Sequence, residues 1–148
     1  MSGALRTRRF FFYGTLQGGA RTRMARWLEP RLGACARASL AGRLVAIPAG
    51  DGWFPALIPG RPGQRAWGTL CDVRLTVRDL ARLDRYEGRD YRRATLPVLA
   101  QGGGRARAQA YVWRGALPAR ARPIASGDFL AWLAATGRRP FSTRRNGI

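Results

Sequence analysis

Short extended segments outnumber helical ones in this chain, and the two kinds do not alternate regularly. We predict extended segments at residues 9–13, 36–47, 54–58, 66–75, 91–99 and 106–113. Regular alternation of strands with helices would indicate a parallel, doubly wound sheet. Its absence favours a mixed or largely antiparallel sheet that can close into a barrel, with helices at its side.

Residues 76–87 carry the signals of a helix from end to end. Thr76 is of a type that caps helix N-termini, and Asp79 stands three residues further on. Leucines follow at helical spacing, and Gly88 supplies a stop signal. The pattern therefore predicts a helix that ends at Glu87.

The remaining elements are punctuated by Gly, Pro and Ser. A helix is predicted over residues 21–32, ended or bent by Pro30, and a last helix capped by Ser126. Gly42 and Gly68 fall inside extended segments and indicate interruptions of the strands.

Length and composition indicate one domain with one core. A chain of 148 residues with 46% hydrophobic residues can bury a sizeable interior. No apolar run approaches the roughly 20 residues that span a bilayer, and the run at residues 10–12 is too short for a signal peptide. We therefore expect a single cytoplasmic domain over residues 1–148, without membrane contact, ending in a basic, loosely ordered tail from about residue 137.

Missing residue types exclude several chemistries. The chain has no histidine and no lysine, which excludes a Ser-His-Asp or Cys-His triad, a Schiff-base lysine and a P-loop lysine. An ordinary structural zinc site is not expected either, because Cys35 and Cys71 are the only cysteines. These two cysteines fit a reducing compartment, although a disulfide between them is possible.

The formal net charge of +19 comes from arginines scattered over the whole chain. One interpretation is binding to nucleic acid or another anionic partner. The other is a set of solvated faces that use Arg in place of Lys. The aromatic residues near strands, such as Trp53, Phe54, Tyr111 and Trp113, are interpreted mostly as core. They do not cluster within an arginine-rich segment, so nucleic-acid binding is possible but not favoured.

Glu87 is the first candidate for chemistry. It shares one face of the predicted helix with Leu80 and Leu83, so its carboxylate should point toward the core side. Burial and the helix C-terminus both raise a carboxyl pKa toward values useful for proton transfer. The plainer alternative is a solvated glutamate before a capping glycine, and nearby Arg89, Arg92 and Arg93 would oppose a raised pKa if they reached it.

The second candidate is the segment 13–16, which leads from a strand into a turn. Such a turn exposes backbone N–H groups that can hold a carboxylate or a polarised carbonyl. Gly14 lets the backbone approach a ligand closely. An ordinary tight connection between a strand and a helix would have the same pattern.

Taken together, the segments FFFYGTL, FPALIPG, WGTLCDV, LARLDRYEGRDYRR and AYVW resemble the gamma-glutamylcyclotransferase-like superfamily, including its avirulence-induced-like and gamma-glutamylamine cyclotransferase branches. The resemblance implies a small mixed α+β barrel with flanking helices. It implies Glu87 as the catalytic carboxylate. It implies a substrate-binding set made of Tyr13, Gly14, Thr15, Leu16 and Tyr91. Gln17 begins a departure from the pattern usual after YGTL, which bears on the substrate more than on the fold.

The implied reaction is compatible with the residues available. In a gamma-glutamyl compound the alpha-amine attacks the gamma-carbonyl, and 5-oxoproline and an amine or amino acid leave. The substrate carries its own nucleophile, so an enzyme of this acyltransferase or lyase type needs no cofactor or metal, only a base, an acid and oxyanion donors. The alternative is a non-catalytic member of the fold that binds an anionic partner through its arginines; the leaving group and the oligomeric state stay open.

Overall fold

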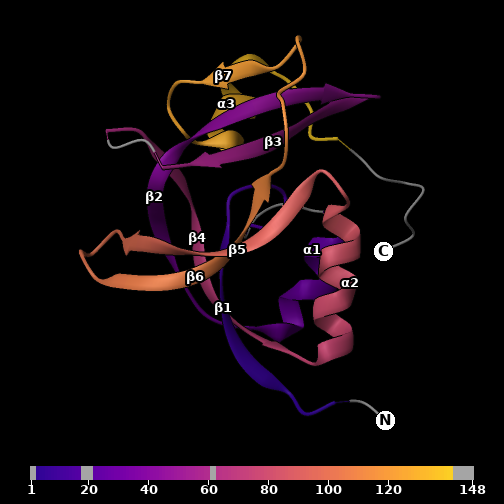
Figure 1. Ribbon diagram of the computed structural model, residues 1–148, viewed down its shortest axis with the longest axis vertical. Helices are drawn as coiled ribbons and strands as arrows, with labels where there is room; N and C mark the ends of the chain where they lie inside the picture. Colours follow the sequence, from indigo (N-terminus) through magenta and orange to yellow (C-terminus); the bar gives the residue numbers. More distant parts are fainter. Residues whose placement is uncertain (1–2, 18–21, 61–62, 142–148) are drawn as a thin grey trace.

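The computed structural model describes residues 3–17, 22–60 and 63–141. Five strands lie side by side in this order: β2 (Leu32–Ala49), β4 (Arg65–Leu75), β1 (Arg6–Phe12), β6 (Arg105–Trp113) and β5 (Tyr91–Ala100). β2 also pairs with β5, which closes the sheet into a barrel (Figure 1). β1 and β6 run parallel, and the other barrel pairs are antiparallel. The predicted α+β fold, a mixed and largely antiparallel barrel with flanking helices, is confirmed.

A smaller layer extends the sheet at one end of the barrel. The long strand β2 continues beyond the barrel and pairs there with β3 (Gly52–Pro59) and β7 (Arg122–Ile124). Helix α3 (Phe129–Thr136) covers this extension (Figure 1), with Phe129 and Leu133 buried in the same core cluster as Leu44 and Leu57. The three-residue strand β7 was not expected from the sequence.

The phenylalanine run at residues 10–12 serves two hydrophobic cores. Alternate side chains of a strand point to opposite faces. Phe11 accordingly joins the core inside the barrel, whereas Phe10 and Phe12 join a second cluster. That second cluster lies under α1 (Arg23–Leu28) and α2 (Val77–Glu87), through Met24 and Leu83. β1 therefore links both cores and delivers the segment 13–16 where they meet.

Helix α2 begins and ends as predicted. The Thr76 side chain accepts a hydrogen bond from the Asp79 backbone N–H at 3.0 Å, and the Asp79 carboxylate accepts one from the Thr76 N–H at 3.0 Å. At the other end Gly88 takes a φ of 86° and donates its N–H to the carbonyl of Asp84 at 3.1 Å. A left-handed φ of this kind favours glycine, so the chain stops the helix with Glu87 in its last turn.

Two predictions about helices need correction. The helix expected over residues 21–32 is confined to α1 and is followed by the short turn η1 (Glu29–Arg31), because Thr22 caps its start and Pro30 cannot continue it; residue 21 lies outside the described residues. Ser126 does not cap α3. Asp128 is the cap and accepts from the Ala131 N–H at 3.1 Å, while Ser126 accepts from the N–H of Asp128 itself.

The expected strand interruptions at Gly42 and Gly68 are also wrong. Both residues lie inside continuous strands. At Gly68 the reason for glycine is steric, because a Cβ there would lie 2.2 Å from the carbonyl oxygen of Phe12. Glycine thus permits close packing of β1 on β4 rather than a break.

The two cysteines pair with each other. Cys35 on β2 and Cys71 on β4 are directly opposite in register and form a disulfide. A cytoplasmic location stays a prediction, and the disulfide would then have to persist against cellular thiols. Among the described residues, no helix is both long enough and apolar enough to cross a membrane.

The C-terminal segment is only partly as expected. Residues 142–148 of the predicted loose tail lie outside the described residues. Residues 138–141 instead lie along β3, where Pro140 forms a bridge with Trp53. The backbone N–H of Trp53 donates a hydrogen bond to the carbonyl of Arg139 at 2.9 Å.

Candidate active site

A cavity of about 300 Å³ opens where the barrel meets the C-terminal end of α2. The structure brings all the sequence-predicted site residues to its lining: Tyr13, Gly14, Thr15, Leu16, Glu87 and Tyr91. Other lining residues come from β3, the end of α2, the link from α2 to β5, β6 and the C-terminal segment, among them Trp53, Phe54, Pro55, Arg85, Tyr86, Asp90, Tyr111 and Phe141. The predicted set is therefore one spatial site, and the role of each member stays a prediction.

The turn after β1 lines this cavity with residues 14–16. Gln17 donates its N–H to the carbonyl of Gly14 at 3.2 Å, which closes the turn. In the part of the chain that the structure describes, the N–H groups of Gly14, Thr15 and Leu16 have no hydrogen-bond acceptor. A Cβ on Gly14 would lie 3.0 Å from Pro55 Cγ, so glycine lets the turn pack close to β3. The arrangement suits a ligand oxygen that carries negative charge.

Glu87 lies in the cavity wall, and its carboxyl group has no partner among the residues that the structure describes. The side chain keeps some contact with solvent but is otherwise surrounded by protein. No hydrogen bond or ion pair reaches its carboxylate from any described residue. Burial, and then the negative charge of Asp84, raise the pKa of Glu87 from 4.5 to about 8. A carboxyl group with this pKa can accept and return a proton near neutral pH.

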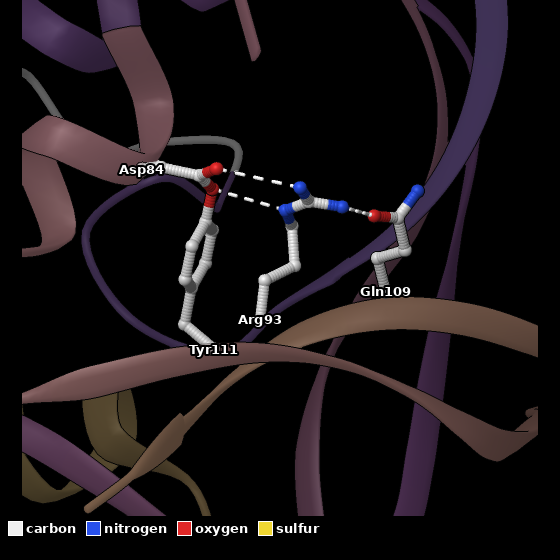
Figure 2. Close-up of polar contacts among 4 residues, drawn as sticks. All are labelled: Asp84, Arg93, Gln109 and Tyr111. Carbon is white, nitrogen blue, oxygen red and sulfur yellow. Dashed lines mark hydrogen bonds and ion pairs between the residues drawn. The ribbon is translucent and has the colours of Figure 1, made fainter. Parts of the chain in front are cut away.

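The arginines near Glu87 do not neutralise it. Arg93 lies on β5 and binds Asp84 instead, with Nε 3.0 Å from Oδ1 and a second nitrogen 3.3 Å from Oδ2 (Figure 2). Arg89 and Arg92 are exposed. These three arginines therefore do not lower the pKa of Glu87, an effect that the sequence alone left open.

Asp84 is the centre of a polar network behind the cavity. It accepts a hydrogen bond from the Tyr111 hydroxyl at 2.7 Å, and Arg93 extends the network to the side chain of Gln109 (Figure 2). The backbone carbonyl of Tyr111 in turn accepts a hydrogen bond from the Tyr13 hydroxyl. The network thus ties α2, β5 and β6 to the turn after β1 and fixes the shape of the site.

All four tyrosines of the chain line this cavity: Tyr13, Tyr86, Tyr91 and Tyr111. Burial raises the pKa of each, and the Glu87 carboxylate adds to the rise. Tyr91 donates its hydroxyl to the carbonyl of Pro55 at 2.5 Å. The raised pKa values keep the tyrosines protonated, and Tyr13, Tyr91 and Tyr111 each donate a hydrogen bond within the protein.

Sequence reasoning missed several residues of the site. Asp84 was recognisable in principle, because it precedes Glu87 by three residues and so lies on the same side of α2. Tyr111, Trp53 and Phe54 were interpreted as core, although each also borders the cavity. Phe141 carried no signal, since it follows the last predicted helix in a segment expected to be loose.

Metal-binding arrangements are not found around the cavity or elsewhere in the described part of the chain. No group of three or more His, Cys, Asp or Glu side chains there lies close enough to hold an ion.

Comparison with known proteins gives a family match over most of the chain. Residues 10–131 match the family described as "Gamma-glutamyl cyclotransferase, AIG2-like". The matched range contains the turn after β1, α2 and both flanking strands, and it ends before residues 138–141. No curated protein matches the chain in sequence.

Solved structures share the fold at low sequence identity. YkqA from Bacillus subtilis aligns with a TM-score of 0.67 and 19% identity over 89% of this chain, which spans only 43% of YkqA. An AIG2-like protein from Mus musculus aligns with a TM-score of 0.56 and 23% identity, over 76% of this chain and 81% of the mouse protein. A protein called gamma-glutamyl cyclotransferase aligns with a TM-score of 0.59 and 16% identity, over 94% and 92% of the two chains.

Proposed function

Because this chain belongs to the gamma-glutamyl cyclotransferase, AIG2-like family, we propose that it cyclises a gamma-glutamyl compound and releases 5-oxoproline and an amine or amino acid. The observation that carries the proposal is the carboxyl group of Glu87, with a pKa of about 8, in the same cavity as the turn at residues 14–16. Neither that carboxyl group nor the N–H groups of this turn have a hydrogen-bond partner among the described residues.

Each step of the reaction has a group to perform it. Glu87 takes a proton from the alpha-ammonium group of the substrate, and the free amine attacks the gamma-carbonyl carbon. The N–H groups of the turn stabilise the oxyanion that forms. Collapse of this intermediate breaks the bond to the leaving nitrogen, which receives the proton from Glu87. The carboxylate so regenerated takes the second proton from the ring nitrogen and passes it to the released amine, which leaves as an ammonium ion. The substrate supplies the nucleophile, so one carboxyl group can serve both transfers.

The pH dependence of kcat/KM should report the ionisation of Glu87. The base is its carboxylate form, which is populated only above its pKa, so activity should rise with pH along a limb centred near 8. An ordinary solvated glutamate would place that limb near 4.5. Initial rates of 5-oxoproline release at low substrate concentration, across this range, distinguish the two.

Replacing Asp84 by Asn should move the same limb to lower pH. The charge of Asp84 is the second cause of the raised Glu87 pKa, and Asn removes that charge while its amide oxygen can still accept from Tyr111. Asp72→Asn is the matched control, because Asp72 pairs with Arg9 on β1 at 3.4 Å and does not line the cavity. An Asp84→Asn profile that coincides with that of the native protein would contradict this coupling.

A panel of gamma-glutamyl amines and gamma-glutamyl amino acids, assayed for 5-oxoproline, tests the proposal as a whole. Release from at least one compound, unaffected by moderate salt, supports it. Silence across the panel, together with tight and salt-sensitive binding of DNA or RNA, would instead favour a non-catalytic protein that binds anions through its arginines. We keep a cytoplasmic location as part of the proposal.

A further inference from the structure

Residues 138–141, called here the C-terminal strap, lie beyond the family match and bring Phe141 to the lining of the cavity. The strap runs along the first residues of β3. The Trp53 N–H donates to the Arg139 carbonyl at 2.9 Å, and the Phe141 N–H donates to the Trp53 carbonyl at 2.7 Å. These two bonds hold the strap on both sides of Pro140.

Side-chain packing also holds the strap against the rest of the fold. The guanidinium of Arg138 lies 5.0 Å from the ring centres of both Trp53 and Trp132, which anchors the start of the strap by cation–π contact. A Cβ on Gly52 would lie 2.5 Å from the carbonyl oxygen of Pro140, so only glycine leaves room there. The strap is therefore closely packed against β3 and α3.

The strap places Phe141 among the aromatic side chains of β3. Its ring centre lies 6.1 Å from that of Phe54, and Phe54 lies 6.4 Å from Tyr91. Phe141, Trp53, Phe54 and Pro55 border the cavity and carry no charge. We call these four residues the aromatic wall.

The cavity thus has two chemically different parts. The turn at residues 13–16 and the end of α2 supply hydrogen-bond donors and the Glu87 carboxylate, which suit the charged and polar gamma-glutamyl group. The aromatic wall suits an apolar ring. Among the described lining residues the one cation is Arg85, which lies on α2 and not in the aromatic wall. Arg138 packs on Trp53 but does not line the cavity, so the aromatic wall offers the leaving group no lining cation to pair with a carboxylate.

We propose that Phe141 is a specificity-determining residue, and that the cavity selects gamma-glutamyl compounds whose leaving amine carries an aromatic ring and no carboxylate. This inference rests on the proposed cyclotransferase function and names its substrate class. It assigns the leaving group to the aromatic wall and the gamma-glutamyl group to the polar part.

Three compounds test the assignment: gamma-glutamyl-2-phenylethylamine, gamma-glutamylmethylamine and gamma-glutamylphenylalanine. The first and second differ by a benzyl group, that is the ring and one methylene, and the first and third differ by one carboxylate. We expect the phenylethylamine compound to have a kcat/KM about tenfold or more above either of the others. Equal values for the phenylethylamine and methylamine compounds would overturn the inference, even though release of 5-oxoproline would still support the proposed function.

Phe141→Ala should reduce the preference for phenylethylamine over methylamine by about tenfold. Gly52→Ala should act in the same direction, because it displaces Pro140 without altering Phe141. Leu99→Ala is the control: Leu99 is an exposed apolar residue at the other end of β5 from Tyr91, and its loss should leave the preference intact. A folded Phe141→Ala protein that keeps the native preference would contradict the proposal.

Binding measured by calorimetry keeps the test independent of turnover. The three compounds are titrated into the Glu87→Gln protein, with and without the Phe141→Ala change. Tighter binding of the phenylethylamine compound that requires Phe141 supports the inference. Indifference of binding to the ring overturns it. Failure of every compound to release 5-oxoproline from the native protein counts against the proposed function instead.

Discussion

Glu87→Gln should lower the turnover of a gamma-glutamyl substrate by about 10²–10⁴-fold, the usual contribution of a positioned proton acceptor. Gln is nearly the same size and has a similar helix propensity, so α2 and its ending at Gly88 should be retained. Substrate binding should change far less, because the N–H groups of residues 14–16 remain. Steady-state kinetics on a confirmed substrate measures both effects.

Glu29→Gln is the matched control for this substitution. Glu29 is the only other glutamate of the chain and is exposed at the start of η1, so the same change there should be close to neutral. Turnover of the Glu87→Gln protein within a few-fold of the native rate would contradict the assignment of Glu87 as acid and base.

The stability of the Glu87→Gln protein provides a second readout with a definite sign. The folded-state pKa of Glu87 lies above its ordinary value of 4.5, so the native protein loses stability as pH rises from about 4.5 to about 8. Gln carries no charge and avoids this loss. The variant should therefore be more stable than the native protein at pH 8, by on the order of 4 kcal/mol, and the difference should nearly vanish by pH 4.5. If the variant and the native protein had the same stability at pH 8 as well as at pH 4.5, Glu87 would be a solvated carboxylate with an ordinary pKa.

Gly68→Ala should destabilise the fold by about 3 kcal/mol, the upper part of the range for overpacked positions. The added Cβ would lie 2.2 Å from the carbonyl oxygen of Phe12 and 3.0 Å from the ring of Phe11. Neither neighbour can move freely, because β1 is paired with β4 on one side and with β6 on the other. Urea unfolding measures the loss.

The control for this change is Gly104→Ala, in the turn between β5 and β6. A Cβ there has no heavy atom within 4 Å, so the free energy of unfolding should change by less than about 0.5 kcal/mol. If Gly68→Ala proved as stable as Gly104→Ala, the close packing of β1 against β4 would be refuted. The Gly68→Ala protein should also lose enzymatic activity, because the turn that lines the cavity follows directly after Phe12.

The parts of the fold that local sequence predicts are those with local causes. The ends of α2 follow from Thr76, Asp79 and Gly88, which act on neighbouring backbone groups. The strands follow from extended apolar patterns between turns. Glu87 was placed on the core side by helix spacing alone, and the structure puts it in a cavity wall.

The features that the sequence did not predict correctly have non-local causes. Gly68 looks like a strand break in sequence, and only the approach of Phe12 from another strand explains it. Asp84 gains its importance from Tyr111 and Arg93, which lie on other strands. The C-terminal strap depends on Gly52, some ninety residues earlier in the chain, so its own composition indicates only a basic tail.

The most direct test of the account is the identity of the product released from the best gamma-glutamyl substrate, with its alpha-amine labelled by heavy nitrogen. Intramolecular attack predicts 5-oxoproline that retains the label, together with an unlabelled amine, and mass spectrometry detects both. The Glu87→Gln protein should form neither at a comparable rate. Labelled glutamate in place of 5-oxoproline would show that water, rather than the substrate's own amine, attacks the carbonyl, and would contradict the central claim.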